Sequence, residues 1–198
     1  TGWTKQRTGY ADFRQRVITA TDALKRAGYN AFDIRKEKGA RPESRSIVQH
    51  EGLGKPVTYL GRYAEKYRAE GDSTLTNGLC GDWGYLEGRW QGFIDSTGVD
   101  VIVDMGKVTD IKDVEANFMH QLEAVIYVPN TITLLVSKDG KKFTTIDKTL
   151  PGIKTSSDYL VYPYRWKGSV HARYVCLKAT SREPDAWIFT DEIIINKK

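Results

Sequence analysis

Residues 132–147 read Ile-Thr-Leu-Leu-Val-Ser-Lys-Asp-Gly-Lys-Lys-Phe-Thr-Thr-Ile-Asp, two runs rich in β-branched and apolar residues around Asp139-Gly140. An Asp-Gly pair between two such runs is a strong β-hairpin signal. Runs of the same texture recur from Gly54 onward, separated by Gly, Asp, Asn and Pro, and we expect strands at 99–105, 114–119, 124–128, 132–137, 143–147, 159–162, 172–179 and 187–195. This pattern predicts an all-β fold, an antiparallel β-sandwich of the jelly-roll type.

The N-terminal part has a different texture. From Tyr10 to Ala27 apolar residues recur every three or four positions, and Gly28 follows where a helix C-cap would stand. This spacing predicts one amphipathic helix. Residues 37–49 are charged and almost free of large apolar side chains, as in a connector. We therefore expect a helix and connector over 1–50 and the jelly roll over 51–198.

The composition is that of a folded globular protein, with 198 residues, 40% hydrophobic and 28% charged. No run predicts a membrane span or a targeting peptide, and the chain starts at Thr1 without Met, so we expect a segment of a longer protein. The net charge of +5 permits a nucleic-acid partner. Acidic and basic residues are interleaved, however, as in 33–38 and 65–70, which argues against a phosphate-binding surface.

Catalytic motifs do not stand out. Cys80 and Cys176 form no CxxC pair, so they are either two thiols or one long-range disulfide, and the three histidines have no metal-binding spacing. Asp191 and Glu192 are adjacent carboxylates, a residue type that drives glycoside hydrolysis. Neighbours on a strand point to opposite faces, so we expect that these two do not line one site. A small self-contained glycosidase is the competing interpretation.

Aromatic residues gather between Gly81 and Phe93, where four aromatics stand among four glycines. Flat rings beside polar groups suit a sugar-binding loop. Trp83 and Tyr85 are the better ligand candidates, because Trp90 and Phe93 could instead fill the end of the sandwich. Residues 71–78 hold many oxygen-bearing side chains, which suit either calcium or ordinary Asx and Ser/Thr turns.

Seven short motifs in order carry a resemblance to a known family. They are Gly-Lys-Pro-Val-Thr-Tyr at 54–59, Gly-Asp-Ser-Thr-Leu-Thr-Asn-Gly at 71–78, Arg-Trp-Gln-Gly-Phe at 89–93, Val-Asp-Met-Gly at 103–106, Val-Ser-Lys-Asp-Gly at 136–140, Ala-Arg-Tyr-Val at 172–175 and Trp-Ile-Phe-Thr-Asp-Glu-Ile at 187–193. The chain resembles the galactose-binding-like module of the discoidin or coagulation-factor type C kind. It is most similar to those at the C-terminus of bacterial family 20 glycoside hydrolases, the β-N-acetylhexosaminidases or chitobiases. The helix at 10–27 resembles the last helix of their catalytic barrel.

The resemblance implies a non-catalytic module that binds carbohydrate or docks against the catalytic barrel of the parent chain. A purely structural domain and a cell-surface adhesion module are the alternatives. The implied glycan-binding residues are Asp82, Trp83, Tyr85, Trp90, Gln91, His120 and Gln121. The implied structural calcium ligands are Asp72, Thr74, Asn77 and Glu192; Asn77 stands where many relatives have Asp, which removes a charge. The parent enzyme implies export to the periplasm, the cell surface or the medium.

Overall fold

The computed structural model describes residues 47–82, 84–94, 97–152 and 159–198, which belong to a compact unit bounded by Ser46 and Lys198. The expected helix at 10–27, most of the connector and Trp83 lie outside the described residues. The backbone N–H of Val48 donates to Gly78 O, and that of Glu51 donates to Ile195 O. Residues 48–51 are therefore bonded into the sandwich.

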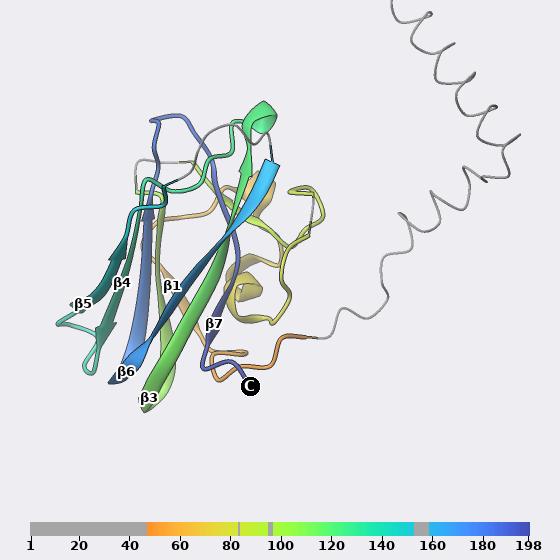
Figure 1. Ribbon diagram of the computed structural model, residues 1–198. Coiled ribbons are helices and arrows are strands. Elements are labelled where there is room, and N and C mark those ends of the chain that lie inside the picture. The colour runs from red at the N-terminus through yellow and green to blue at the C-terminus, as the bar shows by residue number, and fades with distance from the viewer. Residues whose placement is uncertain (1–46, 83, 95–96, 153–158) are drawn as a thin grey trace, which may run out of the picture. The chain divides into compact units, whose positions relative to one another are not determined.

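The all-β prediction is confirmed (Figure 1). The strands are β1 (Val57–Tyr59), β2 (Gln91–Phe93), β3 (Val99–Gln121), β4 (Thr131–Ser137), β5 (Thr144–Thr149), β6 (Tyr159–Thr180) and β7 (Ile188–Ile195). Helical structure within the described residues is confined to the 3-10 turns η1 (Glu65–Tyr67), η2 (Gly71–Thr76) and η3 (Leu122–Ala124), and no helix there is long and apolar enough to cross a membrane. The strands run antiparallel in the order β2-β7-β3-β6-β4-β5, with β1 beside β3.

Two long strands make a sandwich out of this one sheet. β3 and β6 pair along almost their whole length, with register shifts between Asp104 and Thr109 and between Ile111 and Asp113. Before the shifts β3 also pairs with β1, and after them it pairs with β7. Register shifts of this kind increase bending and twist, so the paired strands β3 and β6 can contribute to both layers of the sandwich. Figure 1 shows β5 and β4 side by side on one flank and β7 on the other side of β3.

Alternating burial builds the core between the layers. In β3 the side chains of Val99, Val101 and Val103 are buried and those between them are half-exposed. β4 repeats the pattern with Ile132 and Leu134. This is the period of two that a strand with one covered face requires. β7 differs, since all eight of its residues are buried; its second face is covered by η2 and the loop that follows it.

The hairpin at Asp139-Gly140 forms as predicted between β4 and β5. Gly140 has φ +72°, a left-handed conformation that glycine adopts without strain. Asp139 Oδ1 accepts the backbone N–H groups of Lys141 and Lys142, both at 2.9 Å, and these donors lower the pKa of Asp139 to about 2. The carboxylate of Asp139 therefore stabilises the turn that the Asp-Gly pair predicts.

The lowered pKa of Asp139 predicts that part of the free energy of unfolding is lost in acid. Because its pKa is lower in the folded chain than in the unfolded one, its contribution is complete above about pH 4 and is lost as the pH falls through about 2. NMR titration of the Asp139 carboxyl carbon should give a midpoint near pH 2. Asp185, an exposed carboxylate, is the reference in the same spectrum. A midpoint for Asp139 in the ordinary Asp range would contradict the turn geometry.

The strand expected at 124–128 is wrong. The chain there forms η3 and then a left-handed turn at Val125, φ +57°, and Ile126 makes only isolated bridges to Gln121 and Trp187. The apolar residues that suggested a strand are instead used in tertiary packing, since Ile126 is buried in a second, smaller core with Trp90, Met119 and Phe189. β1 and β2 were missed because three residues are too few to show a period.

Both cysteines are free thiols. Cys176 is buried in β6 and Cys80 is half-buried. Burial raises the pKa of each to about 12. Of the two alternatives open from the sequence, the structure therefore favours unreactive thiols over a disulfide.

Candidate functional site

The loop over β7 is held by a bulge in that strand. β3 residues Ala116 and Phe118 pair with Ile193 and Thr190, so two residues of β7, Asp191 and Glu192, stand opposite one residue of β3. A bulge re-aims side chains and interrupts strict alternation. Both carboxylates consequently bind the same covering loop, at Gly78 and Gly81.

The two carboxylates bind the loop at backbone groups three residues apart. Glu192 Oε2 accepts Gly78 N–H at 3.0 Å, and Asp191 Oδ2 accepts Gly81 N–H at 2.8 Å and Asn117 Nδ2 at 3.0 Å. Both acids are fully buried, and burial raises the pKa of each. Since neither side chain reaches solvent, their role here is to hold the loop.

Trp90 closes the base of the aromatic loop. Its Nε1 donates to Asp82 O at 2.8 Å, and only 1% of the residue is exposed. Gly81 lies against the indole, since a Cβ added there would stand 2.1 Å from Trp90 Cε2. The two ends of this loop, Asp82 and Trp90, are therefore held together.

Three half-buried rings pack against the buried ring of Phe189, and we call Tyr67, Tyr85 and Trp187 the aromatic patch. Tyr67 is central: its ring centroid lies 4.9 Å from that of Trp187, 5.0 Å from that of Phe189 and 5.8 Å from that of Tyr85, each at a steep angle. Edge-to-face packing of this kind fixes ring orientation. The rings of the patch are thus fixed relative to one another, and each of the three residues keeps part of its surface exposed.

A hollow of about 430 Å³ is lined by Gly81, Asp82 and the first residues of β6, Tyr159 to Val161. Tyr159 packs against the same small core as Tyr85 and Trp187. Burial and the charge of Glu87 raise the pKa of Tyr159, which places a carboxylate near this phenol. Aromatic rings therefore lie close to a concave surface that also carries polar groups.

The predicted glycan-binding residues divide by exposure. Asp82, Tyr85 and Gln121 are half-exposed, whereas Trp90, Gln91 and His120 are buried and offer no surface to a sugar. His120 has its ring 5.8 Å from that of Tyr127. Sequence reasoning missed Tyr67 and Trp187; the only signal for Trp187 was its place in the last motif of the resemblance.

Each predicted calcium ligand makes a hydrogen bond within the protein. Asp72 Oδ1 accepts from the Tyr63 hydroxyl at 2.7 Å, Asn77 Oδ1 accepts Leu79 N–H, and Thr74 Oγ1 donates to Gly71 O. Within the described residues there is no group of three or more His, Cys, Asp or Glu side chains that could hold a metal ion. Calcium needs six to eight oxygens directed at one point. Its binding stays a prediction of the resemblance, and this donor set does not fit it.

Comparison with known proteins adds the fold. No family model and no curated protein matches the chain. Among solved structures, a chitosan-binding module in complex with chitotriose, from a Paenibacillus chitosanase/glucanase, is 14% identical with a TM-score of 0.50, covering 74% of this chain and 98% of that one. A Ruminococcus gnavus GH29 fucosidase in complex with fucose is 12% identical with a TM-score of 0.54, covering 76% of this chain and 27% of that one. The fold is a galactose-binding-like jelly roll.

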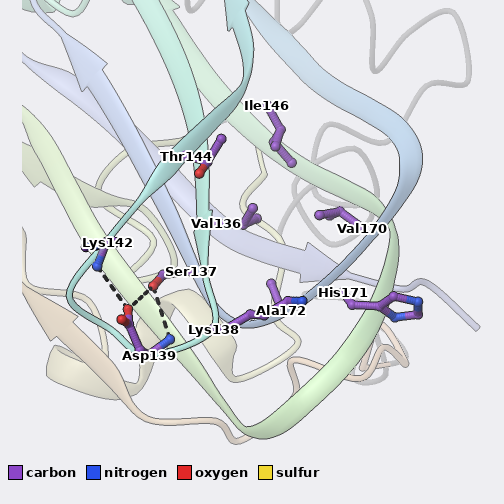
Figure 2. Close-up of a pocket in the computed structure, with 10 residues that line it drawn as sticks. All are labelled: Val136, Ser137, Lys138, Asp139, Lys142, Thr144, Ile146, Val170, His171 and Ala172. Atoms are coloured by element: carbon purple, nitrogen blue, oxygen red, sulfur yellow. Dashed lines mark hydrogen bonds between the residues drawn. The ribbon is translucent and has the colours of Figure 1, made fainter.

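The jelly roll has a second hollow, of about 350 Å³, beside the β4–β5 hairpin (Figure 2). Figure 2 shows the aliphatic side chains Val136, Ile146 and Val170 around it, with the Ser137–Asp139 hydrogen bonds at one edge. None of its described lining residues is Phe, Tyr or Trp. Because this hollow lacks the large Tyr and Trp rings on which a sugar stacks, the aromatic patch is the better candidate for ligand binding.

Proposed function

We propose that this chain is a non-catalytic carbohydrate-binding accessory module of a glycoside hydrolase, and that it holds glycan on the aromatic patch. The observation that carries the proposal is the fixed arrangement of Tyr67, Tyr85 and Trp187 beside the hollow at Gly81 and Asp82. Ligand sites are typically concave, lined with apolar and aromatic groups and a few polar ones. The chitosan-binding module with its chitotriose has the same fold and supports this choice.

The division of work within the site follows from the geometry. The ring faces of the aromatic patch can pack on the apolar C–H face of a pyranose. The hydroxyl groups of the sugar then remain free to contact polar groups of the protein. Asp82 and Gln121 are half-exposed and carry oxygens and an amide suited to hydroxyl groups. Trp90 and Gln91 contribute by supporting the loop.

The finer assignment rests on the sequence resemblance. We infer that the parent protein is an exported β-N-acetylhexosaminidase whose glycans contain N-acetylglucosamine or N-acetylgalactosamine. The catalytic barrel of that parent would be the second partner. An NMR titration of the full chain with chitobiose, N-acetylgalactosamine, galactose and fucose tests whether the module binds sugar and which of these sugars it prefers. Saturable shifts at patch residues support the module; absence of any response at millimolar sugar leaves a structural domain.

Trp187→Ala should weaken glycan binding about tenfold or more, because a loss of about 1.4 kcal/mol of stacking corresponds to that factor. Calorimetry with the best sugar from the titration measures it. Tyr174→Ala is the matched control, since Tyr174 is a half-exposed ring that packs on Gly140 at the β4–β5 hairpin. Equal loss in both variants would contradict a site at the aromatic patch.

A further inference from the structure

The loop at residues 78–81 is bound to β7 by backbone N–H groups that donate to the carboxylates of Asp191 and Glu192. Glu192 is also the residue at which the resemblance implies a cation. Glu192 lies at the centre of this contact and is fully buried. His50 and the backbone of Gly78 contact its two oxygens, each at 3.0 Å. The chemistry of these donors decides whether the carboxylate can also serve a metal ion.

The ring nitrogen of His50 that carries the proton can be assigned from the hydrogen bond that Nδ1 makes. Ile195 N–H donates to His50 Nδ1 at 3.2 Å, so Nδ1 is the acceptor and the hydrogen lies on Nε2. Nε2–H then donates to Glu192 Oε1. Both carboxylate oxygens of Glu192 therefore accept N–H groups. A cation bound to the same oxygens would face two donor hydrogens at close range, which is electrostatically unfavourable.

The loop carbonyls are capped in the same manner. Gln91 Nε2 donates to Arg68 O at 3.2 Å and to Gly71 O at 2.9 Å, and Thr74 Oγ1 approaches the same two carbonyls at 3.2 and 2.8 Å. The Tyr59 hydroxyl donates to Gln91 Oε1 at 2.9 Å, at the other end of the amide. Converging carbonyl oxygens usually require a cation or an N–H donor between them. Here the amide nitrogen supplies the donor.

We propose that His50, Glu192 and Gln91 replace a divalent cation as the groups that hold residues 68–78 against β2 and β7, so that glycan binding by this module is independent of calcium. The binding part of this inference rests on the proposed function. Glu192 fixes Gly78, and Asp191 fixes Gly81 next to Asp82 and the hollow. These are positioning residues, because none of them is exposed to a ligand.

The first test compares the melting temperature of the full chain in EDTA and in excess calcium chloride. A specific site loaded to about a hundred times its Kd would raise the melting temperature of a protein this size by roughly 5–10 °C. We expect no shift. A calcium-dependent rise of that size would overturn the proposal, and this result does not depend on any glycan being bound.

The second test concerns positioning. Glu192→Gln should weaken glycan binding several-fold and shift the amide resonances of residues 78–82, at a temperature where its spectrum shows a folded chain. Glu183→Gln, which changes an exposed carboxylate, is the control. Unchanged affinity and unchanged loop resonances in Glu192→Gln would overturn the positioning role. Absence of sugar binding by the wild-type chain would instead count against the proposed function, while the calcium test would stand.

Discussion

His50→Ala should lower the free energy of unfolding by about 3–5 kcal/mol, because removing one partner of a buried polar pair leaves the other uncompensated. Both side chains of the His50–Glu192 pair are fully buried, and burial already raises the pKa of Glu192. The variant also removes the acceptor of Ile195 N–H. Urea unfolding followed by fluorescence measures the change.

His171→Ala is the control for that experiment. The His171 side chain is 70% exposed and its nearest carboxylate oxygen, on Asp110, lies 3.9 Å away. Surface changes of this kind usually stay within about 0.5 kcal/mol. A His50→Ala variant as stable as His171→Ala would show that the buried pair contributes little to the fold.

Trp90→Ala should cost about 3–5 kcal/mol and should also abolish measurable glycan binding. The cost follows from removing a large buried aromatic side chain from the small core that it forms with Met119, Ile126 and Phe189. The binding loss follows because the indole Nε1 holds Asp82 O and the ring supports Gly81. Without it the loop loses the contact that closes its base.

Two variants separate these effects. Trp90→Phe keeps part of the ring but removes the donor, so it should be destabilised less while still weakening binding, since Asp82 O loses its partner. Leu86→Ala changes a loop residue that is 74% exposed and should leave stability within about 0.5 kcal/mol of wild type. Full binding by Trp90→Ala would contradict a supporting role for the indole.

Local sequence signals predicted the parts of the fold that neighbours in the chain decide. The Asp139-Gly140 hairpin forms because its turn residues and flanking strands agree, and the alternation in β3 and β4 appears as buried and half-exposed side chains. Residues 124–128 failed because the same apolar composition serves a strand or an irregular segment packed in a core. Only contacts with Trp187 and Gln121 distinguish the two.

The candidate site was predicted in part. Tyr85 and Asp82 are half-buried and lie outside any strand, as a glycine-rich run of aromatic residues indicates. Tyr67 and Trp187 could not be placed beside them, because they are far apart in sequence and meet only through the packing of η1 on β7 residues. Trp90 and Gln91 have the residue types of sugar ligands, but their burial makes them supports.

The sequence by itself determined the all-β class, the hairpin and the region of the chain that would carry the aromatic residues, because these depend on local propensity and period. The tertiary structure decided how Asp191 and Glu192 are used. Their common direction comes from one extra residue in β7 opposite β3, a register that no single strand contains. Through that bulge, two carboxylates with the appearance of a catalytic or metal-binding pair became the buried acceptors that hold a loop.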